Sequence, residues 1–236
     1  AVGAIPYVMG IGAGYLDAYF ETMSGFTTTG ITMFTGLDYM PRSILFWRSM
    51  TQWLGGLGIL SFFLIVAFKG TGAHMLFGAE SHKIEAGRPV PGFHNTVRVL
   101  WYIYAGFSVF IFICLWLAGM SWFDSMCHTM TALSTGGYSP HDASIGFYRA
   151  QGYPHFRLIE YITILGMVMG GMNFLVHYRV LTGKVKTLFK NTEMKLFWSI
   201  IAAATAAILI ERYYGILPKS YSPATGEFWA LLEENF

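Results

Sequence analysis

Two short polar stretches in this sequence have the residue types expected of a site that holds a bare cation. The first is SGFTTTGIT at 24–32, and the second is ALSTGGYS at 132–139. In each stretch, small hydroxyl residues lead into glycine, and the flanking sequence is strongly apolar. The candidate ion ligands are Thr28, Thr29, Gly30, Ser134, Thr135 and Gly136.

Backbone carbonyls are the groups that would do this chemistry. Successive carbonyls that converge on one axis replace the hydration shell of a permeating cation. Glycine suits such a loop because it tolerates backbone angles closed to other residues and puts no side chain in the ion path. A turn capped by serine or threonine would explain either stretch alone. We favour a cation filter because the pattern occurs twice.

Each polar stretch follows an apolar segment that is too short to cross a bilayer. These segments cover 15–26 and 122–133, whereas a spanning helix needs about 20 residues. Each opens near an aspartate, Asp17 or Asp124, which suits the positive end of a helix dipole. We therefore expect two re-entrant half-helices, each with its negative end beside a filter loop and surrounded by protein or a water-filled cavity.

The composition predicts an all-α membrane protein. Of the 236 residues, 54% are hydrophobic and only 12% are charged, whereas an ordinary globular domain carries about a quarter charged residues. A net charge of +2 without a basic groove pattern argues against a nucleic acid partner. Four segments have the length and apolarity of membrane spans, at about 44–68, 99–120, 158–181 and 196–210.

The order of these segments repeats along the chain. NTVRVLW at 95–101 returns as TEMKLFW at 192–198, and GGLGIL at 55–60 returns as GGMNFL at 170–175. DAYFETMSGFTTTG returns, one residue shorter, as DSMCHTMTALSTG, which aligns Gly30 with Gly136. The repeating unit is therefore a span, a half-helix, a filter loop and a second span. We expect Gly30 and Gly136 at one depth, as neighbouring walls of a pore.

The repeat predicts five regions. They are a first pore unit without its opening span at 1–68, a cytoplasmic loop at 69–98, a second pore unit at 99–181, a basic cytoplasmic loop at 182–195 and the start of a third pore unit at 196–236. This pattern suggests a fragment of a longer protein. Two loops do not enclose a pore on all sides, so we expect no conduction by this chain alone. A pore assembled from two copies is the alternative.

Charge sets the expected orientation. The segments 69–98 and 179–195 hold four and five Lys or Arg residues, against two in each of the other connections. Positive-inside bias places the two basic segments in the cytoplasm and the filter loops outside.

For the remaining candidates we favour structural roles. The glycines of WLGGLGIL and GMVMGGMN allow close helix packing, and Gly166 with Gly170 has the GxxxG spacing. Glu21, His128 and Glu160 lie near membrane depth, where ionisable residues suggest function. We expect structural pairing around the pore for these three.

Two other function classes remain as alternatives. Ser134 with His141 and Asp142, or with His155, would supply the residues of an intramembrane serine hydrolase. No G-x-S-x-G elbow is present in the sequence, and Thr28, which the repeat aligns with Ser134, has no matching histidine. A non-conducting scaffold is the third class, but it leaves two filter-like loops at equivalent positions unexplained.

Longer motifs identify a family. FETMSGFTTTGIT, WRSMTQWLGGLGIL and ALSTGGYSPHDASIGFY, with LWYIYAGF and MNFLVHYR, resemble the Trk/Ktr/HKT superfamily of cation transporters, and its TrkH branch most. The resemblance covers nearly the whole chain. It implies four units of the potassium-channel type around one pore, with Thr28–Gly30 in the first filter loop and Ser134–Gly136 in the second. The glycines imply a preference for K+, and a sodium or mixed K+/Na+ transporter of the same fold is the alternative.

The resemblance also implies partners and a location. It indicates the pore-forming subunit of a potassium uptake system, which is not an enzyme and has K+ as its transported ion and no cofactor in this chain. It places a multi-pass protein in the plasma (inner) membrane, as a homodimer with a cytoplasmic nucleotide-binding regulatory subunit of the TrkA type. The basic segment 179–195 is the candidate contact for that subunit. The gate and the remaining filter loops would belong to later units.

Overall fold

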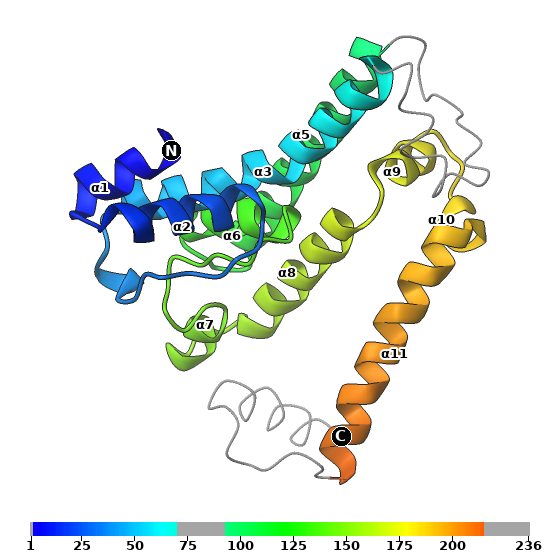
Figure 1. Ribbon diagram of the computed structural model, residues 1–236. Coiled ribbons are helices and arrows are strands. Elements are labelled where there is room, and N and C mark those ends of the chain that lie inside the picture. Colours follow the sequence, from blue (N-terminus) through cyan, green and yellow to red (C-terminus); the bar gives the residue numbers. More distant parts are fainter. Residues whose placement is uncertain (1, 70–92, 215–236) are drawn as a thin grey trace. The chain divides into compact units, whose positions relative to one another are not determined.

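The computed structural model describes residues 2–69 and 93–214, with side chains described for 2–58 and 98–211. These residues form helices and loops without strands, which confirms the all-α prediction. The chain divides into two compact units, 1–178 and 179–236. The helices of the first unit are η1 (Val2–Ala4), α1 (Ile5–Ile11), α2 (Tyr15–Phe26), η2 (Leu37–Tyr39), α3 (Arg42–Lys69), α5 (Phe93–Leu117), α6 (Trp122–Leu133), α7 (Gly146–Ala150), α8 (Phe156–Gly171) and most of α9 (Phe174–Leu181) (Figure 1). The second unit contains α10 (Thr187–Lys190) and α11 (Thr192–Tyr214).

The two predicted half-helices exist with the expected bounds. Helices α2 and α6 have 12 residues each, a length of about 18 Å that is short for a membrane span. The side chain of Ser121 caps the start of α6 by accepting a hydrogen bond from the backbone N–H of Asp124 at 3.1 Å. Asp17 and Asp124 lie in the first turns of α2 and α6, where carboxylates are stabilised by the helix dipole.

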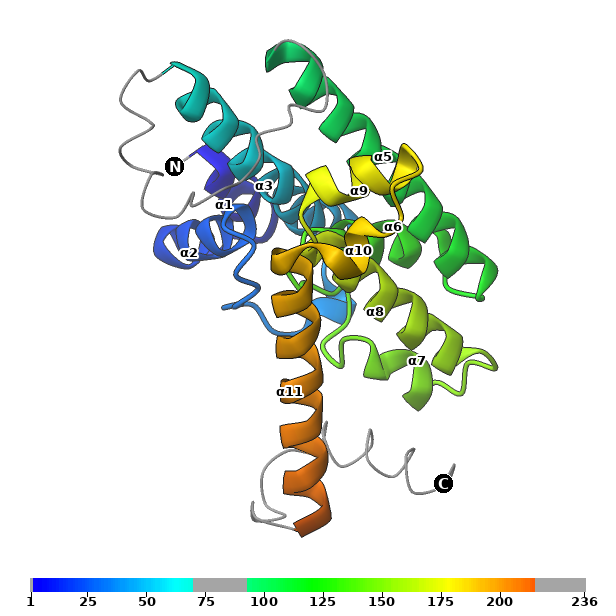
Figure 2. The ribbon, with the colours of Figure 1, turned by 90° about the vertical axis from the view of Figure 1, so that its right-hand side faces the viewer.

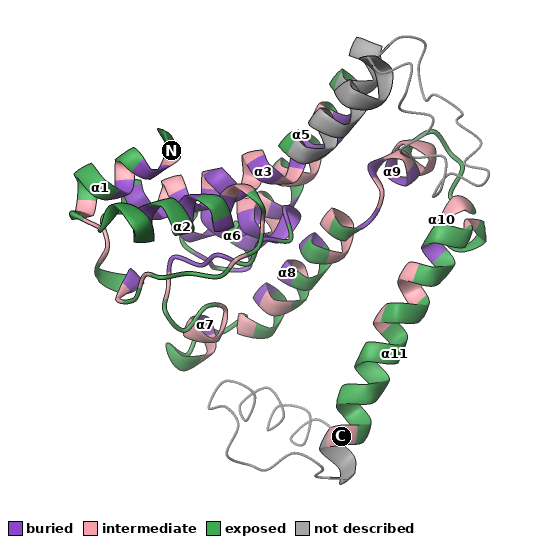
Figure 3. Cartoon of the chain, in the orientation of Figure 1, coloured by how far each residue is buried: buried purple, intermediate pink, exposed green. Residues whose placement is uncertain are grey.

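Helix α6 lies at the centre of the first unit. It packs against α3, α5 and α8 (Figure 2), and the buried residues concentrate on it and on the adjoining part of α3 (Figure 3). Its core neighbours include Leu57, Tyr104, Ile111 and Ile159. Helix α2 packs against α3. A smaller core at this end of the chain consists of Ala4, Tyr7, Ala18 and Ile44.

Glycines bring the long helices close to the ends of the half-helices. A Cβ at Gly55 of α3 would overlap the backbone carbonyl of Phe26, the last residue of α2. A Cβ at Gly170 of α8 would overlap the carbonyl of Leu133, the last residue of α6, in the same way. The packing interpretation is therefore confirmed for Gly55 and Gly170, whereas nothing lies within 4 Å of a Cβ at Gly58.

The predicted span at 158–181 is not one helix. Helix α8 ends in two glycines, and α9 leaves at a bend of 102°. Met172 between them is extended, and the side chain of Asn173 accepts a hydrogen bond from the N–H of Leu175 at 2.9 Å. Nε2 of His177 lies 2.8 Å from the carbonyl oxygen of Met169, across the break. Glycines that end one helix and an asparagine that caps the next explain the bend.

Two helices of the described residues are long and apolar enough to cross a membrane singly. They run over Arg98–Leu117 and Thr192–Glu211, and the bent pair α8 and α9 is a third if it counts as one span. Helix α3 has 28 residues, but its side chains beyond residue 58 lie outside the described part, as does most of the predicted loop at 69–98. Helices α5 and α11 begin at Phe93 and Thr192, earlier than the predicted span starts at 99 and 196.

Candidate functional site

The two filter-like stretches follow the C-termini of α2 and α6 with the same backbone path. Thr28 and Thr135 both have left-handed backbone angles, with φ of 53° and 55°. Two residues further on, Gly30 and Gly137 have φ of 81° and 82°. A threonine with positive φ is uncommon, so its recurrence at the same place in both loops marks one conserved local geometry within the repeat.

Hydrogen bonds fix the register of this repeat. The N–H of Thr29 donates to the carbonyl of Ser24 at 2.9 Å, and the N–H of Gly136 donates to the carbonyl of Thr131 at 2.9 Å. Thr29 therefore corresponds to Gly136. Thr28–Thr29–Gly30 corresponds to 135–137, and the two segments align without a gap.

The predicted alignment of Gly30 with Gly136 is therefore wrong by one residue. The partner of Gly30 is Gly137, which the sequence analysis did not select. Ser134 corresponds to Thr27, and its hydroxyl donates to the carbonyl of Thr131 at 3.2 Å. The sequence STGG offers two adjacent glycines, and the equal length of α2 and α6 is the signal that would have selected the second.

The structure brings the two loops into contact. A Cβ at Gly30 would overlap the carbonyl oxygen of Gly136. Gly136 itself is buried, and a Cβ there would overlap the side-chain amide of Gln52. The expectation that Gly30 and Gly136 are neighbours is confirmed by this contact, and their place in the walls of a pore stays a prediction.

A buried ion pair from α2 and α3 ties both loops together. Nε of Arg48 donates to Oε1 of Glu21 at 2.8 Å, and the two side chains are 1% and 0% exposed. The same guanidinium donates to the carbonyl of Ser139 at 3.0 Å and to the hydroxyl of Thr32 at 3.1 Å. Glu21 also accepts from Thr32 and from the N–H of Met33. The pairing predicted for Glu21 is therefore present, with Arg48 as its partner.

Tyr138 links the second loop to this pair. Its hydroxyl donates to the backbone carbonyl of Glu21 at 2.9 Å, and the guanidinium carbon of Arg48 lies 4.3 Å from the centre of its ring. Its N–H donates to Oε1 of Gln52 at 3.0 Å. Arg48 and Gln52 lie one turn apart on α3, so they share a helix face. Arg48 is a charged residue in an apolar segment, and that is the sequence signal that points to it.

His128 and Glu160 have surroundings different from those of Glu21. His128 of α6 is buried edge-on to the ring of Tyr148 at 5.7 Å, and its Nε2 has no hydrogen-bond partner in the described part of the chain. Glu160 of α8 is half-buried and feels the charges of Arg149 and Arg157. The structural pairing predicted for His128 is therefore an aromatic contact.

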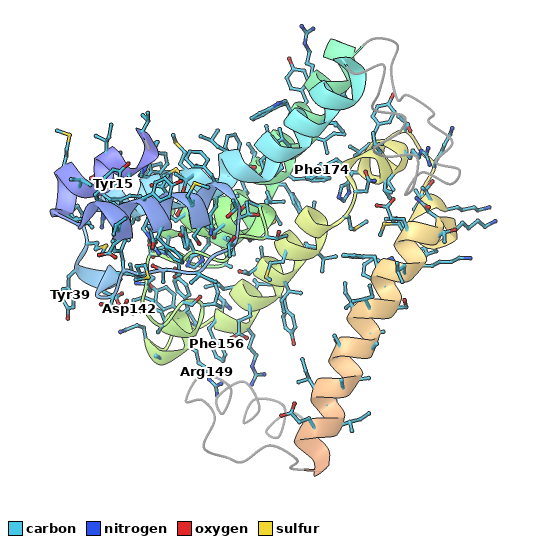
Figure 4. The ribbon with its side chains drawn as sticks, in the orientation of Figure 1. Tyr15, Tyr39, Asp142, Arg149, Phe156 and Phe174 are labelled. Carbon is cyan, nitrogen blue, oxygen red and sulfur yellow. The ribbon has the colours of Figure 1, made fainter. Side chains whose placement is uncertain are left out.

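A second charged cluster joins the ends of the two loops. Nδ1 of His141 lies 2.5 Å from Oδ1 of Asp38 in η2, and its Nε2 lies 3.3 Å from Oδ2 of Asp124 in α6. The backbone N–H of Asp142 also points at Asp38, at 3.3 Å. Figure 4 shows Asp142 and Tyr39 in these two connections.

The two carboxylates control the protonation of this histidine. Burial lowers the pKa of His141, but the contacts with Asp124 and Asp38 outweigh burial, so its pKa is raised above 6.5. The contact with His141 in turn lowers the pKa of Asp38. The cluster therefore favours a protonated histidine between two charged carboxylates.

Several known proteins are similar to this chain. The potassium uptake protein TrkH of the Trk system of Escherichia coli K12 is 32% identical over 223 residues, which cover 91% of this chain and 45% of that protein. An uncharacterized cation transporter of Methanocaldococcus jannaschii is 37% identical over 89% of this chain and 41% of its own length. The crystal structure of the potassium transporter TrkH from Vibrio parahaemolyticus matches with a TM-score of 0.71 at 28% identity, over 93% of this chain and 44% of that chain.

The chain thus spans about half the length of the relatives it matches. The relative with a similar sequence and the solved structure with a similar fold carry the same name, TrkH. Because the family model for TrkH, described as a cation transport protein, matches residues 7–209, the chain belongs to the TrkH family of membrane cation transporters.

Proposed function

We propose that this chain forms two walls of a K+ pore, as part of the pore-forming subunit of a potassium uptake system. The observation that carries the proposal is the contact between two loops of equal backbone path, each at the end of a half-helix. The names of the relatives as potassium uptake proteins support K+ as the ion.

The proposed ion ligands are backbone carbonyls of both loops. In the first loop they belong to Thr28, Thr29 and Gly30. In the second loop they belong to the predicted Thr135 and to Gly137, which corresponds to Gly30. The carbonyl of the predicted Gly136 accepts a hydrogen bond from Nε2 of Gln52 at 2.9 Å and lies against Gly30, so Gly136 positions the loop. Ser134, the remaining predicted ligand, is the residue at which α6 ends, and its carbonyl accepts a hydrogen bond from the Thr135 hydroxyl at 2.7 Å.

A carbonyl ring favours K+ when enough oxygens replace its hydration shell. The positive φ angles of Gly30 and Gly137 turn successive peptide groups without a side chain in the way. A sodium or mixed K+/Na+ transporter of the same fold is the second candidate.

A serine hydrolase is not supported by the geometry. The hydroxyl of Ser134 donates to the carbonyl of Thr131 in its own helix, and His141 binds Asp38. A catalytic serine would need to bond its histidine, and Ser134 and His141 are engaged elsewhere.

The assembly that we propose extends beyond this chain. Further pore units would complete the ring, in a homodimer of multi-pass subunits in the plasma membrane. The filter loops would face outside and the basic segments 69–98 and 179–195 would face the cytoplasm. A cytoplasmic nucleotide-binding regulatory subunit of the TrkA type would dock there, with the exposed residues Lys184 and Lys186 among its contacts.

The test substitutes two equivalent residues, Thr29 in the first loop and Gly136 in the second. The full-length protein with Gly136→Ser or Thr29→Val is expressed in cells that lack other K+ uptake, and K+ and Na+ uptake are measured. Gly136→Ser should lower the K+/Na+ ratio, because the new side chain overlaps the amide of Gln52 and displaces the loop. Thr29→Val should change the ratio little, because the carbonyl remains. If Gly136→Ser left the K+/Na+ uptake ratio unchanged while Thr29→Val abolished the preference for K+, side chains would select the ion. That result would refute the proposed filter.

A further inference from the structure

Gln52 of α3 is a fully buried polar side chain at the junction of the two loops. It is 0% exposed. A polar amide buried without partners is destabilising, so both ends of this amide need hydrogen bonds. They find them in the second loop rather than in the helix that carries Gln52.

The amide binds two backbone groups on either side of Gly137. Nε2 donates to the carbonyl of Gly136 at 2.9 Å, and Oε1 accepts from the N–H of Tyr138 at 3.0 Å. A side-chain amide has both a donor and an acceptor, and here each is matched to the complementary backbone group. This pair of bonds fixes the two peptide groups that flank the positive φ of Gly137.

The first loop lies against the same place. A Cβ at Gly30 would overlap the carbonyl oxygen of Gly136 and would lie 3.9 Å from Nε2 of Gln52. The position of the Gly136 carbonyl therefore sets the separation of the two loops. Within the second loop, Gly136 and Tyr138 are buried whereas Thr135 and Gly137 are exposed, so the amide holds the residues that face α3.

We propose that Gln52 is a positioning residue for ion selection, which fixes the Gly136 peptide and thereby the spacing of the two filter walls. This inference rests on the proposed K+ filter. A ring with one wall no longer held in place still admits a cation but distinguishes ions less well, because K+ selectivity depends on the number and placement of the carbonyls.

The experiment uses the full-length protein with Gln52→Met, Gln52→Glu or Ser108→Ala. Methionine keeps the length of the side chain and removes both bonds. Glutamate keeps an acceptor for Tyr138 and puts an oxygen against the Gly136 carbonyl. Ser108→Ala is the matched control, because it removes a hydrogen bond of 2.9 Å from the next residue of α3, Trp53, away from the loops. K+ and Na+ uptake and surface expression are measured in each variant.

We expect the K+/Na+ uptake ratio to fall about tenfold in Gln52→Met, which loses both bonds, and about threefold in Gln52→Glu, which loses one, since each lost bond contributes about 0.7 kcal/mol. Ser108→Ala should keep the wild-type ratio. Wild-type ratios in both Gln52 variants would overturn the inference. So would failure of both to reach the membrane while Ser108→Ala does, because Gln52 would then serve folding alone. A wild-type protein that does not prefer K+ would instead refute the proposed function.

Discussion

The two filter-like loops follow one backbone path but are held in different ways. In the first loop, Thr27, Thr29 and Ile31 are exposed. The residues at the same places in the second loop are Ser134, Gly136 and Tyr138, and all three are buried. Helix α3 covers the second loop, and its residues Arg48 and Gln52 make the contacts. Equal backbone geometry therefore does not require equal support.

The buried charge is the largest difference between the surroundings of the two half-helices, α2 and α6. Glu21 in α2 pairs with Arg48, whereas the residue at its place in α6 is His128. Gly55 and Gly170 pack alike against the ends of the two half-helices. Arg48 lies seven residues before Gly55, and Thr163 of α8 lies seven residues before Gly170, so the two correspond. Thr163 donates to the carbonyl of Ile159 in its own helix. Within the described residues, the contact between α6 and α8 thus has no ion pair at the positions of Glu21 and Arg48.

Removing Arg48 should have the largest effect. Arg48→Met leaves Glu21 buried without its partner and cuts the bonds to both loops, so we expect a loss of about 3–5 kcal/mol in the free energy of unfolding. K+ uptake should be abolished. Thermal unfolding of the purified full-length protein and uptake in cells measure the two effects.

The double variant Arg48→Met with Glu21→Gln tests the cause. It should recover part of the stability, because no buried charge is left unpaired, but not the uptake. Arg42→Gln is the control, since Arg42 is an exposed arginine on the same helix. If Arg48→Met were as stable as Arg42→Gln, the ion pair would not be what holds the two loops.

A smaller effect should separate the two equivalent glycines. Gly30→Ala and Gly137→Ala both place a side chain at positive φ, which costs about 1–2 kcal/mol. Only Gly30→Ala also overlaps the neighbouring loop, because nothing lies within 4 Å of a Cβ at Gly137. We expect Gly30→Ala to lower both the unfolding temperature and the K+/Na+ uptake ratio more than Gly137→Ala does. Equal losses in the two variants would show that the contact between the loops does not matter.

The sequence predicted local features well and long-range contacts poorly. The bounds of α2 and α6 followed from short apolar segments that begin near Asp17 and Asp124 and end at hydroxyl residues and glycine. The break between α8 and α9 was missed because the segment is apolar throughout, although its Gly-Gly-Met-Asn run contains a helix stop and a helix cap.

The register of the second loop could not be decided from residue types alone. Two adjacent glycines fit the pattern, and it is the equal length of α2 and α6, with the backbone angles, that distinguishes Gly137 from Gly136. The partners of Arg48 and Gln52 were also out of reach, since Arg48 bonds to Ser139 and Gln52 to Gly136 across 91 and 84 residues. Pairings at such separations depend on how helices pack, which the pattern of one chain does not encode.

The ends of the two loops provide the last and smallest test. Phe34 in the first loop occupies the place of His141 in the second, and it packs edge-on to Tyr7 at 5.3 Å. At this position the second loop therefore has a titratable group, His141, in contact with Asp38 and Asp124, where the first loop has an apolar ring.

The raised pKa of His141 determines the direction of the pH effect. Its contribution to stability should be fully present below its ordinary pKa of 6.5 and should be lost as the pH rises through the raised value. The Asp38 contribution runs the other way, since its lowered pKa keeps it present above 3.8 and removes it only as the pH falls further. Because Asp38 is about a third exposed, we expect the His141 contribution to be about 1 kcal/mol or less.

Unfolding temperatures of the full-length protein on either side of pH 6.5 should therefore decline less steeply with rising pH in His141→Gln than in the wild type. Asp38→Asn should remove part of the same slope. Identical pH profiles in the wild type and His141→Gln would mean that the two carboxylates do not stabilise a charged histidine, and that the second loop ends in a neutral contact as the first does.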